Sequence, residues 1–147
     1  MTDEFDAPWA PDPSSDEAYA LFSKGHRVTA DDGTTIAYTV RNPDGAGMPV
    51  LLASGWSCSD AYWGELVPLL EGHGHPCILS DTRGHGLSGL PRPPGRGARN
   101  LTEDDMSMTR LARDLESVLD DAGYRQALVV GHSMGVQTAL ELYRQIP

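Results

Sequence analysis

The sequence is poor in basic residues and in long apolar runs, and each shortage excludes a class of protein. Its 147 residues include 11 Lys and Arg against 21 Asp and Glu, and the formal net charge is −10. Such a chain has no basic patch to neutralise nucleic-acid phosphates or to bind an anionic membrane surface. The sequence contains no run of about 18 apolar residues, which is the length needed to span a bilayer. We therefore expect neither nucleic acid nor a membrane as a partner.

Cysteine is also scarce, and the start of the sequence lacks a targeting signal. Cys58 and Cys77 are too few for a disulfide scaffold and are not spaced as zinc ligands. The first residues show neither the basic segment nor the apolar segment of a secretory signal. We therefore expect free thiols, no metal site and a cytoplasmic location.

The acidic residues are concentrated at the N-terminus. Residues 1–17 contain three prolines, no Lys or Arg, and six acidic residues: Asp3, Glu4, Asp6, Asp12, Asp16 and Glu17. This composition predicts a disordered acidic arm. Because the whole length suits a single domain, we expect one folded unit over residues 18–147.

Residues 127–140 combine an apolar strand, a serine between two glycines and the start of a helix. A serine on a sharp strand-to-helix turn has strained backbone dihedrals, and small residues two before and two after it relieve the crowding. The start of the helix adds N–H groups and a positive dipole that favour an anion beside the serine. The pattern predicts a nucleophile elbow with Ser133 at its tip, flanked by Gly131 and Gly135.

The rest of the sequence predicts alternating strands and helices. Two strands separated by the turn Asp31-Asp32-Gly33 predict an antiparallel hairpin. We expect strands over residues 26–30, 34–41, 49–53, 76–80 and 126–131, and helices over residues 16–23, 60–71, 102–122 and 134–145. The Gly- and Pro-rich residues 81–100 predict an exposed, mobile loop. The fold class is therefore α/β, a hairpin followed by parallel β-α-β-α-β-α with helices on both faces of the sheet.

Three motifs at strand ends give the chain a resemblance to the α/β-hydrolase family from about His26 to the last residue. In the order of the family they are Ala53-Ser54-Gly55-Trp56, Asp81-Thr82-Arg83-Gly84-His85-Gly86-Leu87-Ser88 and Gly131-His132-Ser133-Met134-Gly135. The resemblance implies an esterase-like serine hydrolase that acts on a small-molecule acyl substrate without a cofactor. Ser133 would be the nucleophile, and the backbone N–H groups of Trp56 and Met134 would form the oxyanion hole. Many members have His-Gly where this chain has Ser54-Gly55.

Other polar residues near these motifs have structural interpretations. Asp81, Arg83 and His85 could be read as an acid, a clamp and a base, but in the family this loop is structural, with the aspartate and the arginine organising the turn. His132 precedes the nucleophile and points away from its face, so we expect it to pack under the elbow. Trp56 would lie in the core or form a pocket wall.

Two further patterns imitate binding sites. Gly84-x-Gly86-x-x-Gly89 matches a dinucleotide fingerprint, but the prolines after it prevent the helix that would hold a pyrophosphate. His73, His75 and Cys77 alternate, yet flanking glycines place the histidines in a loop that enters a strand.

The sequence after Ser133 contains one acidic residue, Glu141, and no histidine. The family requires an acid and a histidine after the nucleophile. We therefore expect an N-terminal portion of a larger hydrolase, or a truncated gene product, that is inactive alone. The elbow strand would then form a sheet edge whose apolar, unpaired side favours self-association.

Two alternatives remain open at this point. An acyltransferase or a cofactor-independent dioxygenase can use the same fold, and a turn like Gly55-Trp56 also occurs in such enzymes. The contrasting class is a non-catalytic fragment or binding module whose sheet edge pairs with a partner.

Overall fold

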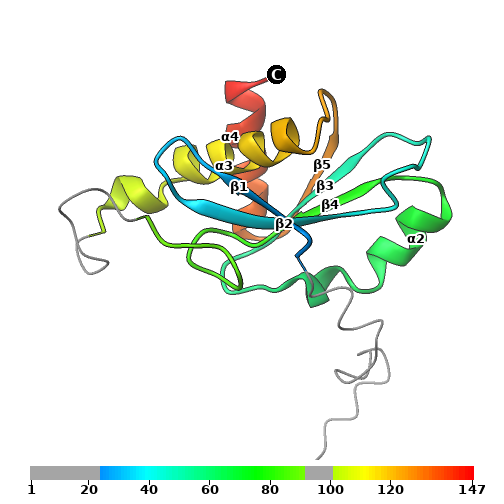
Figure 1. Ribbon diagram of the computed structural model, residues 1–147, viewed down its shortest axis with the longest axis horizontal. Helices are drawn as coiled ribbons and strands as arrows, with labels where there is room; N and C mark the ends of the chain where they lie inside the picture. Colours follow the sequence, from blue (N-terminus) through cyan, green and yellow to red (C-terminus); the bar gives the residue numbers. More distant parts are fainter. Residues whose placement is uncertain (1–23, 92–100) are drawn as a thin grey trace, which may run out of the picture.

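The computed structural model describes residues 24–91 and 101–147, which build a five-stranded mixed sheet with helices on both faces (Figure 1). The strands are β1 (His26–Thr29), β2 (Thr35–Arg41), β3 (Val50–Ala53), β4 (Cys77–Ser80) and β5 (Leu128–Gly131), in the order β1-β2-β4-β3-β5. The acidic arm, the helix expected over 16–23 and the loop residues 92–100 lie outside the described residues.

The centre of the sheet consists of two short, fully buried strands, which are apolar except for Ser80 at the end of β4. Every residue of β3 and β4 is buried, as expected for strands covered on both faces. β3 pairs in parallel with β4 on one side and with β5 on the other, while β2 pairs antiparallel with β4 and with β1. The predicted hairpin and the predicted parallel strands are confirmed.

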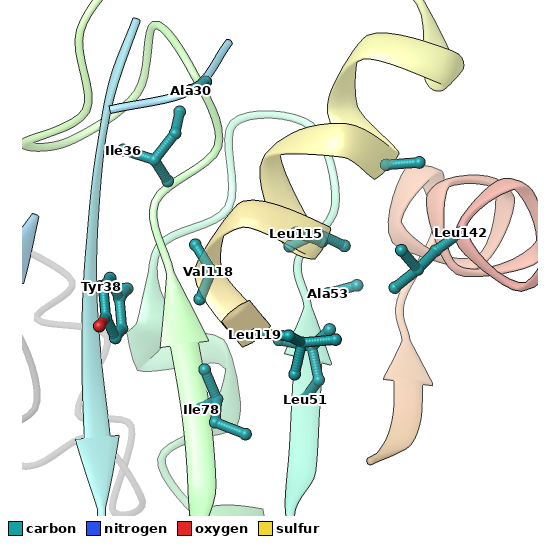
Figure 2. Packing of buried hydrophobic residues seen from close by; sticks show 11 residues of the cluster. Ala30, Ile36, Tyr38, Leu51, Ala53, Ile78, Leu115, Val118, Leu119 and Leu142 are labelled. Atoms are coloured by element: carbon teal, nitrogen blue, oxygen red, sulfur yellow. The ribbon is translucent and has the colours of Figure 1, made fainter. Parts of the chain in front are cut away.

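Two layers of side chains cover the sheet. On one face, α3 (Met108–Asp121) and α4 (Met134–Gln145) pack on strand residues such as Ile36, Leu51 and Ile78 (Figure 2). Val118 and Leu119 of α3 lie directly over this set. On the other face, a smaller cluster joins the strands to the 3-10 helix η1 (Asp60–Trp63) and to α2 (Leu66–Gly72). The helices expected from the sequence therefore cover both faces.

Two of these helices are shorter than the sequence predicts. The helix expected over 60–71 is interrupted after η1, because the ring of Pro68 in a continuous helix would clash with the carbonyl four residues earlier, at Gly64. The chain instead restarts at Leu66, so that Pro68 falls in the first turn of α2. The helix expected from Thr102 begins as the 3-10 helix η3 (Glu103–Met106). The α-helix starts at Met108, where the hydroxyl of Ser107 accepts a hydrogen bond from the Arg110 N–H at 3.2 Å.

β5 forms an edge of the sheet, and apolar side chains remain exposed along it. Leu128 of β5 is 57% exposed, and Leu140 of the adjacent α4 is 66% exposed. Tyr143 and Val136 of α4 are exposed as well. This edge has the pattern that promotes association between chains. In the described part of the chain, no helix has both the length and the apolar composition needed to cross a bilayer.

We expect the chain to self-associate through this edge. The substitution Leu140→Lys should then weaken the association by at least about tenfold. A buried leucine side chain contributes about 1.5 to 3 kcal/mol, and the introduced charge resists burial. Sedimentation velocity over a concentration series measures the effect. Leu69→Lys is the matched control, because Leu69 is 64% exposed on α2, on the other face of the sheet. Equal association of the two variants would contradict the prediction.

Candidate active site

Three turns meet at the carboxyl ends of neighbouring parallel strands. Ser54-Gly55-Trp56 follows β3, Asp81 follows β4, and His132-Ser133 follows β5. The first and the last turn are in close contact, since a Cβ atom placed on Gly55 would lie 3.2 Å from Cβ of Ser133 and 3.0 Å from Nδ1 of His132. The arrangement is the one expected for a site at a sheet end.

Ser133 occupies a strained turn between β5 and α4. Its backbone has φ 55° and ψ −120°, a conformation that an ordinary side chain rarely adopts and that costs about 1 to 3 kcal/mol. The turn is held by hydrogen bonds from His132 N to Ala53 O at 3.0 Å and from Gly135 N to His132 O at 2.8 Å. The serine is exposed at the tip of the turn.

Both elbow glycines lie where a side chain has no room. A Cβ atom on Gly131 would lie 2.7 Å from the backbone of Gly135 and Val136. A Cβ atom on Gly135 would lie 1.9 Å from the carbonyl oxygen of Ala53. The two glycines thus permit the close packing of the turn against itself and against the end of β3.

The expected oxyanion donors, the backbone N–H groups of Trp56 and Met134, belong to the two turns that meet at Gly55 and Ser133. Met134 is the first residue of α4, and Trp56 follows Gly55. In the described part of the chain, the turn and cap hydrogen bonds use the N–H groups of Gly135 and Cys58 but not those of Met134 or Trp56. Trp56 is 57% exposed, which excludes the core position that the sequence allowed.

His132 packs beside the elbow. Its ring stacks on that of Tyr62 with a centroid distance of 3.9 Å, and its Nδ1 lies 4.0 Å from Sγ of Cys58. Among the described residues, none forms a side-chain hydrogen bond with Ser133. The elbow therefore presents a hydroxyl group whose proton has no acceptor in this part of the chain.

Residues 81–91 are the described part of the loop expected over 81–100, and they form a loop closed by its own hydrogen bonds. Gly84, Gly86, Leu87 and Leu90 are exposed, as the composition predicts. Oδ2 of Asp81 accepts a hydrogen bond from Leu87 N at 2.9 Å, and the Asp81 carbonyl accepts one from the Ser88 hydroxyl at 2.7 Å. Gly84 N donates to Gly89 O at 2.8 Å, and no helix starts in this loop. The glycine pattern therefore closes a loop around a carboxylate and lacks the helix N-terminus of a dinucleotide site.

Arg83 joins this loop to other segments through its buried side chain. It is fully buried, and it donates to both carboxylate oxygens of Asp114 at 2.7 Å, to Asp32 at 2.8 Å and to the carbonyl of Asp105 at 3.0 Å. Burial lowers the pKa of Arg83, but the two carboxylates outweigh it and hold that pKa above its usual value. Partial burial raises the pKa of Asp32, yet hydrogen bonds from Arg83 and Thr34 lower it to about 2. Burial raises the pKa of Asp114 above its usual value, although the guanidinium of Arg83 opposes this effect. The network holds the loop to α3 and to the turn at Asp32.

No metal site emerges in the described segments, where no group of three or more His, Cys, Asp and Glu side chains converges on a common point. Nδ1 of His75 instead donates to the Met48 carbonyl at 2.8 Å. The Cys77 thiol is buried in β4, and burial raises its pKa to about 11.

Comparisons with known proteins decide the family. Residues 48–147 match the sequence profile described as the alpha/beta hydrolase fold. The chain belongs to the alpha/beta hydrolase family. The matched region includes the turn after β3, the loop after β4 and the elbow at Ser133.

The similar alpha/beta hydrolases carry several different names. Epoxide hydrolase B of Mycobacterium tuberculosis is 32% identical over 118 residues, which cover 80% of this chain and 31% of that protein. A non-heme chloroperoxidase of Streptomyces lividans is 33% identical over 108 residues, covering 74% and 35%. The structure of an esterase from Exiguobacterium antarcticum superposes with a TM-score of 0.66 at 26% identity, covering 83% of this chain and 40% of that one.

The chain spans about a third of the length of the curated alpha/beta hydrolases that it matches. Its relatives are hydrolases, and because one fold supports many reactions, the family alone does not specify the reaction of this chain.

Sequence reasoning missed several polar contacts that support this site. Lys24 is buried, pairs with Asp60 and lies 3.6 Å from Asp81, and burial lowers its pKa. The Trp63 indole donates to the Ser54 hydroxyl at 2.9 Å. These residues come from separate segments, so the sequence carries no short-range signal for their contacts.

Proposed function

We propose that this chain carries the nucleophile of a serine hydrolase that acts on a carboxylic ester or a similar acyl substrate. The supporting observation is the elbow, where an exposed serine with φ 55° lies beside the Gly55 turn. The Ser133 oxygen attacks the acyl carbonyl, the proton of the hydroxyl passes to a base, and the alcohol leaves with a proton. Water then attacks the acyl-enzyme, which releases the acid and restores the hydroxyl group.

The oxyanion of each tetrahedral intermediate is stabilised by two backbone donors. In this proposal they are the N–H groups of Trp56 and Met134, and the N-terminus of α4 adds its positive dipole. A preorganised donor of this kind lowers the barrier by about 3 to 4 kcal/mol. Because both roles belong to the main chain, the side chains at these two positions shape the acyl pocket.

The base that accepts the proton lies outside the described residues in this proposal. All five histidines lie in the described residues, and none of their rings forms a hydrogen bond with the Ser133 hydroxyl there. His26, for example, stacks on Tyr38 at 5.0 Å, and His132 stacks on Tyr62. In this proposal neither the base nor the acid of the active enzyme comes from the described residues.

Acylation of Ser133 by p-nitrophenyl acetate, in the presence of imidazole as an external base, tests the proposal. We expect an acetyl adduct on the peptide that contains Ser133, formed faster as imidazole is added, with release of nitrophenolate. Ser133→Ala should abolish this adduct. Ser59→Ala is the matched control, because Ser59 is also exposed near the site and its side chain makes no cap hydrogen bond. Peptide mass spectrometry measures both.

The result also separates the alternatives. An adduct that transfers to an added alcohol faster than to water would favour an acyltransferase. The absence of any Ser133 adduct would contradict the acyl-enzyme and favour a dioxygenase or a non-catalytic module.

A further inference from the structure

We infer that His85 is a positioning residue that fixes the oxyanion turn Gly55-Trp56-Ser57-Cys58. This role rests on the proposed function for its catalytic consequence, and on the contacts of His85 for its geometry. His85 lies in the loop after β4, whereas the turn follows β3, so the interaction joins two separate segments at the site.

His85 contacts the turn in two ways. The backbone N–H of Ser57 donates to Nε2 of His85 at 3.2 Å. The His85 ring also meets the Trp56 indole edge-on, with centroids 4.9 Å apart and an interplanar angle of 84°. The ring therefore touches both central residues of the turn.

The second nitrogen of His85 fixes the protonation pattern of the ring. Nδ1 lies 3.0 Å from the carbonyl oxygen of Arg83, which can only accept, so Nδ1 carries the proton. A backbone N–H can only donate, so Nε2 carries none. A single neutral tautomer satisfies both contacts. Because the Arg83 side chain is fully buried and bonded, the ring is tied to a rigid part of the fold.

The turn itself needs such support. Cys58 N donates to Gly55 O at 3.2 Å, which makes Trp56 and Ser57 the central residues of a β-turn. Ser57 has φ 57°, whereas Trp56 is not among the described residues with positive φ. A positive φ at the third position is the mark of a type II turn, which favours glycine there and disfavours serine. Types I and II differ by a flip of the central peptide, here the one between Trp56 and Ser57. The hydrogen bond from the Ser57 N–H to Nε2 of His85 stabilises the type II orientation of this peptide.

The consequence is a defined backbone at the expected oxyanion donor. If the peptide between Trp56 and Ser57 could flip, the segment that carries the Trp56 N–H would sample two conformations. Oxyanion stabilisation depends on donors that are already oriented before the reaction. His85 thus acts on the reaction through the turn, without contact with the substrate.

Two substitutions separate this role from a general structural one. In His85→Gln, the amide oxygen can reach the position of Nε2 and accept from Ser57 N–H. In His85→Asn, the shorter amide can still donate to the Arg83 carbonyl but cannot reach Ser57. We expect the Ser57 amide proton to exchange about three- to tenfold faster in His85→Asn, the effect of one lost hydrogen bond. His85→Gln should restore most of the protection.

The measurements are amide hydrogen exchange by NMR and the rate of Ser133 acylation by p-nitrophenyl acetate with imidazole. We expect His85→Asn to slow acylation about three- to tenfold and His85→Gln to recover it. His75→Asn is the control, because His75 makes a similar bond to Met48 O away from the site. Nitrogen chemical shifts of His85 should show a protonated Nδ1 and an unprotonated Nε2.

Each outcome is decisive. Equal Ser57 exchange in the parent and His85→Asn would overturn the inference, as would faster exchange with unchanged acylation. If the parent forms no Ser133 adduct, the proposed function fails, while the exchange data and the nitrogen shifts still decide whether His85 holds the turn.

Discussion

Replacement of Arg83 by methionine lowers the free energy of unfolding by about 3 to 5 kcal/mol, the usual effect of removing one partner of a buried ion pair. The substitution fills a similar volume but leaves Asp114, whose side chain is 6% exposed, without the guanidinium that bonds both of its oxygens. It also frees one carboxylate oxygen of Asp32. Urea denaturation followed by circular dichroism, at a concentration below self-association, measures the loss.

Two further variants show whether the charge is the cause. Arg113→Met removes an arginine from the same helix as Asp114, but its side chain is 52% exposed and its pairing with Asp31 is loose, so the change should stay within about 0.5 kcal/mol. Replacing Arg83 and Asp114 together by methionine and leucine should recover part of the stability, because no unpaired charge is then buried. A double variant as unstable as Arg83→Met would contradict this explanation.

Gly135→Ala lowers the stability by more than about 3 kcal/mol or prevents folding, which is the upper end of overpacking effects. The added methyl group would lie 1.9 Å from the Ala53 carbonyl oxygen and 2.9 Å from that of Ser54, both of them backbone atoms with little freedom to move. To make room, α4 must shift away from the end of β3, and the elbow must shift with it. Denaturant unfolding measures the stability, and Ser133 acylation measures the geometry.

The control for this prediction is Gly72→Ala at the end of α2. A Cβ atom there meets no atom within 4 Å, and the glycine does not need a positive φ. Alanine should therefore be neutral or should stabilise the helix by up to about 1 kcal/mol. Equal effects at the two glycines would show that the close approach at Gly135 is relieved without cost.

The sequence predicts the main course of the chain because hydrophobic periodicity reports burial directly. The apolar runs over β3 and β4 and the Gly-x-Ser-x-Gly pattern before α4 are local signals, and the structure has strands and a helix at these positions. The elbow glycines could also be anticipated, because crowding at such a turn is a property of the turn itself.

The side-chain contacts that the sequence does not predict join segments that are distant along the chain. The pattern Asp31-Asp32-Gly33 predicts a turn but does not reveal that Asp32 also binds Arg83. The sequence leaves His85 as a possible base or a residue of a structural loop, and its contact with Ser57 depends on the packing of two strand ends. The break before α2 does have a local signal, because Pro68 disfavours a continuous helix over residues 60–71. The helical spacing of the apolar residues around Pro68 nevertheless predicts an unbroken helix.

The contact between β3 and β5 also determines when the site can exist during folding. The β1–β2 hairpin and the β3–β4 pair join segments that are close in sequence, whereas Leu51 of β3 pairs with Val129 of β5, the widest separation in the sheet. The loop-closure cost is greatest for that pairing, so we expect it to form last and the elbow to assemble in the same step. The time at which Ser133 becomes reactive after dilution from denaturant therefore reports the completion of the fold.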